Sequence, residues 1–115
     1  MTKEEGNLEV ERLKGLLTKV DELNRYGERN REEMFKLFDD EWARNVIDKS
    51  DLPYQSYRQN LNYTKNNQLL IYKKIVKRRP KKGAPDEYKE FLNHFKQDIG
   101  VGIREAKHKS GIHEF

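Results

Sequence analysis

Metal chemistry in this chain would depend on its three histidines and its carboxylates, because cysteine is absent. His94, His108 and His113 lie at irregular spacing, and the last two fall in a polar C-terminal stretch. A structural zinc site needs four ligands, usually including cysteines at short spacing. We therefore expect no metal site and no cofactor.

Carboxylates, serines and glycines also lack the spacing that catalysis requires. Asp39, Asp40 and Glu41 stand in a row on the exposed flank of one predicted helix, without a partner in a recognisable cleft. Asp86 and Glu87 follow a proline at the start of another helix, where acids interact favourably with the helix dipole. No phosphate-binding glycine loop and no nucleophile-elbow serine occurs. The sequence predicts that the protein is not an enzyme.

The strongest functional signal is the distribution of charge. Residues 1–50 contain ten basic and thirteen acidic residues, whereas residues 51–115 contain fourteen and seven. From residue 52 to residue 85 there is no acid at all. The basic residues of this stretch are Arg58, Lys65, Lys73, Lys74, Lys77, Arg78, Arg79, Lys81 and Lys82. On solvated helix faces, acidic and basic residues usually alternate. Because this stretch contains basic residues but no acid, it indicates a polyanionic ligand. Four tyrosines lie among these charges, at positions 54, 57, 63 and 72.

Length and composition allow one small domain with a thin core. The chain has 115 residues, of which 34% are hydrophobic and 38% charged. The absence of cysteine favours a reducing compartment. No apolar run approaches the roughly 18 residues of a membrane span, and the N-terminus does not resemble a signal peptide. We expect a cytoplasmic, nucleoid-associated protein.

Residues 7–26 show the spacing of an amphipathic helix, with apolar residues three and four apart. Two interpretations fit: a helix packed on its own domain, or a dimerisation arm. The prediction is a homodimer, because the helices expected at 31–49 and 85–99 carry enough aromatic residues to cover each other. The apolar stripe would then pair with a second copy. Its residues are Leu13, Leu16, Leu17, Val20 and Leu23.

Two further helices are predicted to form the core. Residues 31–49 carry a broad apolar face with Trp42 at its centre, together with Met34, Phe35, Leu37, Phe38, Val46 and Ile47. Residues 85–99 carry Tyr88, Phe91, Leu92, Phe95 and Ile99, with Gly100 or Gly102 expected to end or kink the helix. Residues 68–79 fit a helix or a strand, and residues 79–83 a loop.

Residues 44–62 resemble the helix–turn–helix class in general pattern: a helix end, a break at 50–52 and a short helix at 53–62. Leu52, Tyr57 and Leu61 would pack the second helix. Two positions depart from the pattern, because Ile47 replaces the usual small residue and Asp51 the usual glycine. Glutamine and asparagine can pair with adenine and arginine with guanine in the major groove. The residues offered to nucleic acid are Tyr54, Gln55, Ser56, Arg58, Gln59 and Asn60.

These patterns predict an all-α domain of four to five helices, with an N-terminal amphipathic helix at 1–29, a basic nucleic-acid-binding domain at 30–106 and a flexible tail at 107–115. The function expected is DNA binding by a transcriptional regulator or a phage or plasmid accessory factor, with double-stranded DNA favoured. One alternative is an interaction module that binds a larger nucleoprotein or polymerase. A second is an RNA or single-strand binder, in which the tyrosines stack on bases.

Overall fold

The computed structural model describes residues 2–25, 31–48, 54–69 and 87–111. These residues form four α-helices: α1 (Lys3–Arg25), α2 (Arg31–Ala43), α3 (Gln55–Thr64) and α5 (Glu87–Lys109). Two π-helical turns, η2 (Arg44–Asp48) and η3 (Lys65–Leu69), directly continue α2 and α3. Within these ranges there is no β-strand. The predicted all-α class is confirmed.

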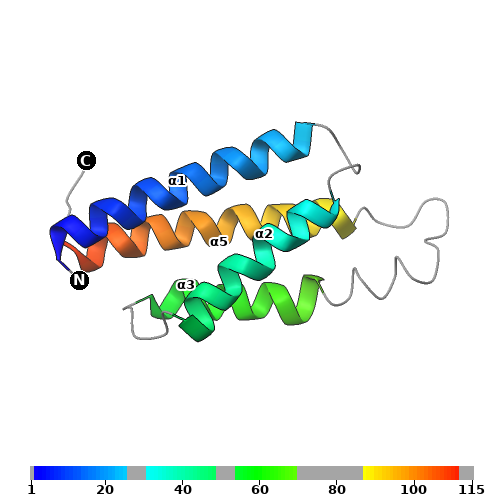
Figure 1. Ribbon diagram of the computed structural model, residues 1–115. Coiled ribbons are helices and arrows are strands. Elements are labelled where there is room, and N and C mark those ends of the chain that lie inside the picture. The colour runs from blue at the N-terminus through cyan, green and yellow to red at the C-terminus, as the bar shows by residue number, and fades with distance from the viewer. Residues whose placement is uncertain (1, 26–30, 49–53, 70–86, 112–115) are drawn as a thin grey trace, which may run out of the picture.

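Helix α5 is the centre of the bundle (Figure 1). Helix α1 runs antiparallel along one side of α5, with Gly6 against Ser110 at one end and Asp21 paired with Lys96 nearer the other. Helix α3 runs antiparallel along another side, and α2 crosses obliquely over α3 and α5. Every other helix therefore uses α5 as its support.

Aromatic residues of α2 and α5 form one half of the core. Phe38 makes edge-on contacts with Phe91 and Phe95, at ring-centroid distances of 5.3 and 5.1 Å. Phe35 meets Phe91 in the same way at 5.5 Å. Such edge-to-face pairs add to the free energy gained by burying the rings. The prediction that these two helices face each other through their aromatic residues is confirmed.

The apolar stripe of α1 is buried within the chain. Leu13 and Val20 are fully buried and Leu23 is 7% exposed, while Leu16 and Leu17 are partly buried against the same cluster. The expectation that the helices at 31–49 and 85–99 leave this stripe without a partner is wrong, because α5 packs against α1 while its aromatic residues contact Phe38 of α2. The homodimer stays a prediction, and these leucines no longer argue for it.

Trp42 is not the fully buried centre of the core that the sequence predicted. It is only partly buried. Its Nε1 donates a hydrogen bond of 2.6 Å to Asn62 Oδ1, and Lys65 Nζ lies 3.3 Å from its ring centroid. The indole N–H needs an acceptor, which favours the edge of a core over its middle. Ile47, predicted on the same apolar face, is 61% exposed.

Helix α5 continues past both glycines that were expected to end or kink it. It runs to Lys109, so the first three residues of the predicted flexible tail are helical, whereas residues 112–115 lie outside the described part. Gly102 lets α3 approach closely, because a Cβ atom there would lie 2.9–3.0 Å from ring atoms of Tyr57. Around Gly100 there is no such neighbour within 4 Å. The ambiguous segment beyond residue 69 and the loop at 79–83 lie outside the described residues.

This difference between the two glycines predicts opposite effects of the same substitution. Gly100→Ala should raise the free energy of unfolding by about 0.5–1 kcal/mol, since alanine favours a helix over glycine. Gly102→Ala should lower it by about 1–2 kcal/mol net, because the Tyr57 ring must move in a filled core. Chemical denaturation of both variants checks this. A stabilising Gly102→Ala would contradict the close packing of α3 on α5.

Candidate nucleic-acid interface

Helix α3, predicted as the reading helix, divides into three faces. Tyr57, Leu61 and Thr64 are buried against the core. Arg58 and Asn62 face α2 and η2: Arg58 Nε donates 2.8 Å to the Asn45 backbone oxygen, and Asn62 accepts from Trp42. The remaining face is exposed and carries Gln55, Ser56 and Gln59.

The N-terminal end of α3 is occupied by a carboxylate from α5. Glu105 accepts hydrogen bonds from the backbone amides of Ser56 and Tyr57, at 2.9 and 3.2 Å. Tyr54, the residue before the helix, provides no side-chain cap. Glu105 satisfies amides that a helix start otherwise leaves open for an anion. A phosphate group would therefore have to bind elsewhere.

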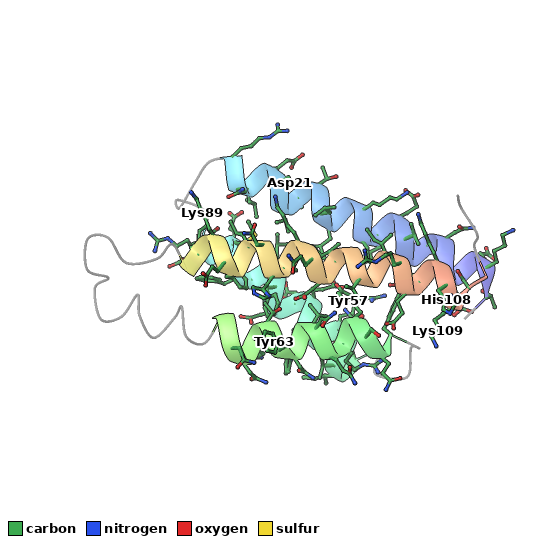
Figure 2. The ribbon with its side chains drawn as sticks, turned by 180° about the vertical axis from the view of Figure 1, so that it is seen from behind. Asp21, Tyr57, Tyr63, Lys89, His108 and Lys109 are labelled. Carbon is green, nitrogen blue, oxygen red and sulfur yellow. The ribbon has the colours of Figure 1, made fainter. Side chains whose placement is uncertain are left out.

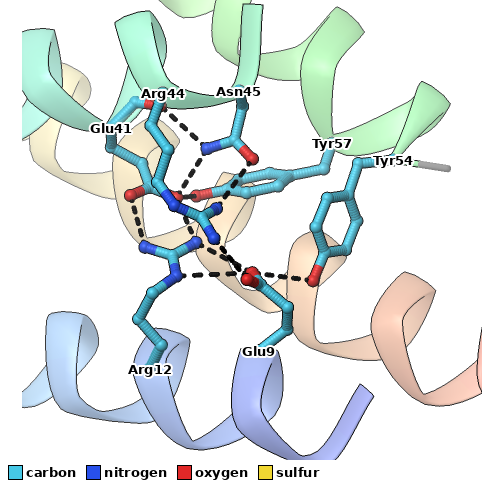
Figure 3. A network of polar contacts seen from close by, with 7 residues as sticks. All are labelled: Glu9, Arg12, Glu41, Arg44, Asn45, Tyr54 and Tyr57. Carbon is cyan, nitrogen blue, oxygen red and sulfur yellow. Dashed lines mark hydrogen bonds and ion pairs between the residues drawn. The ribbon is translucent and has the colours of Figure 1, made fainter. Parts of the chain in front are cut away.

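A buried polar network fixes the orientation of α3 (Figure 3). At its centre, Glu41 is only 5% exposed, so the prediction that it lies on an exposed helix flank is wrong. Its carboxylate accepts two hydrogen bonds from Arg12, at 2.7 and 2.9 Å, one from the Tyr57 hydroxyl at 2.6 Å and one from Asn45 at 2.8 Å. These donors come from α1, α3 and η2, so one carboxylate joins four elements.

Glu9 of α1 forms the second half of this network. It accepts hydrogen bonds from Arg12 at 3.2–3.3 Å and from the Tyr54 hydroxyl at 3.0 Å, and it forms an ion pair with Arg44. Arg44 also contacts Asn45 Oδ1, which connects this carboxylate to the first one. The network is therefore continuous from the start of α1 to the start of α3.

Both carboxylates stay ionised despite their environment. Burial alone would raise the pKa of Glu41, but hydrogen bonds and charge from Arg12, with donors from Tyr57 and Asn45, hold it below its usual value. The pKa of Glu9 is lowered in the same way, with Arg44 and Arg12 outweighing burial. Burial and Glu41 raise the pKa of the Tyr57 hydroxyl, so this tyrosine remains a proton donor.

Asp98 is a buried carboxyl group in a different environment. It is 4% exposed, and Thr64 Oγ1 donates a hydrogen bond of 2.5 Å to its Oδ2. Burial raises the pKa of Asp98 to about 7, against the lowering effect of the Thr64 hydrogen bond. Among the described residues no cation pairs with it. This carboxyl group lies where α3 packs on α5.

The structure brings only part of the predicted interface together. Tyr54 is fully buried and bound to Glu9, so it is not presented to a ligand as predicted, because its hydroxyl completes the network. Arg58 holds α3 on η2, and Lys65 covers the ring of Trp42. Gln55, Ser56 and Gln59 are exposed, and Asn60 is half-buried. The other basic candidates lie outside the described residues: Lys73, Lys74, Lys77, Arg78, Arg79, Lys81 and Lys82.

Glu41 and Asn45 were missed by sequence reasoning, although a signal was present. They continue the buried stripe of Met34 and Phe38 at spacings of three and four, and such spacing keeps residues on one face of a helix. Reading that stripe without regard to polarity would have placed both side chains in the core. Their partner Arg12, on another helix, has no comparable signal.

No protein family, curated protein or solved structure was found to match this chain. Over the described ranges, none of the helices is both long and apolar enough to cross a membrane. In the same part of the chain, no three histidine, aspartate or glutamate side chains are grouped so that they could hold a metal ion. Charge and geometry are therefore the features of this chain that bear on its function.

Asp98 should make the stability of the protein fall as the pH rises. Its pKa increases from 3.8 to about 7 on folding, so between these values the folded protein binds more protons than the unfolded chain, and the free energy of unfolding decreases. Asp98→Asn removes this titration. At pH 8 the variant should be more stable than the parent by about 2–3 kcal/mol, less than the full shift implies because the new amide N–H lacks an acceptor.

Denaturation of both proteins at intervals from pH 4 to pH 8 measures this difference. Near pH 4, where the carboxyl group is protonated in the folded protein, the variant should be less stable than the parent by about 1–2 kcal/mol, because the unpaired amide N–H is then the main difference between them. The difference in stability between the two proteins reports the titration of Asp98 alone. Glu9 and Glu41 are present in both proteins, and their lowered pKa values affect stability at lower pH. If the stability of both proteins depended on pH in the same way, the raised pKa of the buried Asp98 carboxyl group would be contradicted.

Proposed function

We propose that this protein binds nucleic acid, with double-stranded DNA as the preferred ligand. The observation that carries the proposal is the 34-residue stretch from 52 to 85 without an acid, which contains nine basic residues in a chain that is 38% charged. Cations held near phosphates release counterions and supply much of the affinity for DNA. This charge distribution is what such binding requires.

The exposed face of α3 supports the same proposal. Gln55, Ser56 and Gln59 offer amide and hydroxyl groups to solvent, and α3 is held by the network around Glu41. Amide side chains can pair with adenine edges in the major groove. Because Glu105 occupies the amides at the start of α3, we assign phosphate contacts to the basic segment at 73–82 and base contacts to the glutamines.

The biological role proposed is that of a transcriptional regulator or an accessory factor of a phage or plasmid, acting in the cytoplasm at the nucleoid. We also retain the homodimer as a proposal. Two copies on one duplex would raise a weak phosphate affinity through effective concentration. Its interface would have to use surface other than Leu13, Val20 and Leu23, which are buried within the chain.

Single-stranded nucleic acid is the second candidate ligand, and one observation favours it. Tyr63 is 54% exposed, whereas Tyr54 and Tyr57 are fully buried. Base stacking on exposed aromatic rings is the usual means of holding unpaired bases. Of the tyrosines that the structure describes within the basic half, this one alone has a ring available to a ligand.

The basic segment should determine both affinity and salt dependence. A variant in which alanine replaces five basic residues at once loses five charges. The substituted residues are Lys77, Arg78, Arg79, Lys81 and Lys82. Duplex binding should weaken, and the slope of log affinity against log salt should fall by about 0.9 for each phosphate that is no longer neutralised. Fluorescence anisotropy with a labelled random duplex at several salt concentrations measures both quantities.

A variant with Lys14→Ala and Lys19→Ala is the matched control, because these two cations are exposed on α1. It should retain the parent slope. If the five-residue variant also retains slope and affinity, the basic segment does not contact nucleic acid. If the parent protein binds neither duplex nor single strand at low salt, the proposal fails and a protein partner becomes the better explanation.

A further inference from the structure

A groove of about 350 Å³ lies between α3 and α5. It is lined by Asn60 and Tyr63 from α3 and by His94, Gln97, Asp98 and Val101 from α5. Its volume is at the lower end of the range for small-ligand sites. In Figure 2, which shows the molecule from behind, α3 and α5 lie in front of α2, and Tyr63 lies on α3.

One wall of the groove is aromatic. The rings of Tyr63 and His94 lie with their centroids 6.0 Å apart and tilted by 38°. More than half of the surface of Tyr63 is open to solvent. An exposed aromatic face of this kind attracts planar, π-rich ligands.

The two helices also present amide groups to the groove. Asn60 comes from α3 and Gln97 from α5, and both line the groove. Within the part of the chain that the structure describes, neither side-chain amide has a hydrogen-bond partner. Each amide offers two donors and an acceptor. A ligand that carries donors and acceptors on its ring edge could satisfy both.

Asp98 adds a buried acceptor. Thr64 occupies its Oδ2, whereas its Oδ1 has no hydrogen-bond partner among the described residues. The raised pKa of this carboxyl group reflects the same shortage of donors and cations. An amino group on a bound ligand would provide the missing donor.

We propose that this groove holds one unpaired nucleobase with an exocyclic amino group, stacked on Tyr63 and hydrogen-bonded to Asn60, Gln97 and Asp98. Cytosine, adenine and guanine have such an amino group, whereas thymine does not. The inference depends on the proposed function, because it concerns a base within a bound nucleic acid. The position supports it: Tyr63 is followed by the basic stretch, whose clustered cations begin at Lys73, four residues beyond the end of η3.

The test compares three homopolymeric DNA strands of about twelve nucleotides, a length that fits single-strand sites, with a random duplex. The cytosine and adenine strands should bind at least about fivefold more tightly than the thymine strand. Tyr63→Leu should weaken binding of the cytosine strand by about fivefold or more, since stacking contributes substantially for each base. Tyr63→Phe keeps the ring and should bind as the parent does.

Three controls make the result decisive. Asn93→Ala, on an exposed position of α5 that does not line the groove, should leave single-strand binding unchanged. Circular dichroism should show the parent helix content in Tyr63→Leu, because the side chain is largely exposed. Duplex binding should be the same in Tyr63→Leu and the parent.

Two other outcomes overturn the inference in different ways. If the parent binds duplex but shows no preference among the three strands, and Tyr63→Leu binds all of them normally, the groove holds no base while nucleic-acid binding stands. If the parent binds neither duplex nor any strand at low salt, the proposed function itself is wrong, and the groove assignment fails with it.

Discussion

The buried carboxylate of Glu41 is the constraint on which the rest of the structure depends. Removing a charge from water costs several kcal/mol, and that cost is recovered only if donors of good geometry surround it. Here Arg12, Tyr57 and Asn45 provide four hydrogen bonds of 2.6–2.9 Å from three elements besides α2. An apolar contact tolerates sliding, whereas these directional bonds are satisfied in one arrangement of α1, α2 and α3. The thin core of this chain is thereby given a defined geometry.

The orientation of α3 follows from that arrangement. With Tyr57 bound to Glu41 and its ring against Gly102, α3 turns Arg58 and Asn62 toward α2. The surfaces left for ligands are the exposed outer face, which is rich in glutamine, and the groove that α3 shares with α5. The functional proposals concern these two surfaces and the basic stretch that continues the chain. If α3 could rotate about its axis, neither the exposed face nor the groove would present a fixed set of side chains.

Hydrophobic periodicity was sufficient to predict the helices but not all of their contacts. The stripes of α1, α2 and α5 recur every three to four residues, and the structure places helices there. Which face of α5 receives which helix depends on long-range packing, so periodicity alone does not reveal that α5 covers the stripe of α1 as well as contacting α2. The two glycines predict an end or kink of α5 at Gly100 or Gly102, whereas the helix continues to Lys109 and Gly102 serves close packing with Tyr57.

Residues of the candidate site could be predicted only where a side chain with suitable hydrogen-bonding groups is also exposed to solvent. Gln55 and Gln59 are exposed as expected, because α3 packs through the other residues of its helical turn. Tyr54 was assigned to a ligand because it stands among cations, but its hydroxyl binds Glu9, 45 residues away in the sequence. The groove could not be predicted, since Asn60 and Gln97 belong to helices whose pairing is a tertiary property.

Equilibrium unfolding of Glu41→Gln tests the central role of this carboxylate most directly. The account predicts a loss of about 2–4 kcal/mol, somewhat below the cost of breaking a fully buried pair, because Arg12 is partly exposed and keeps Glu9 as a partner. Amide hydrogen exchange should also show α3 losing protection. Asp40→Asn, which removes an exposed carboxylate from the same helix, should change stability by less than about 0.5 kcal/mol. Equal, small effects of both substitutions, with α3 still protected, would contradict the account.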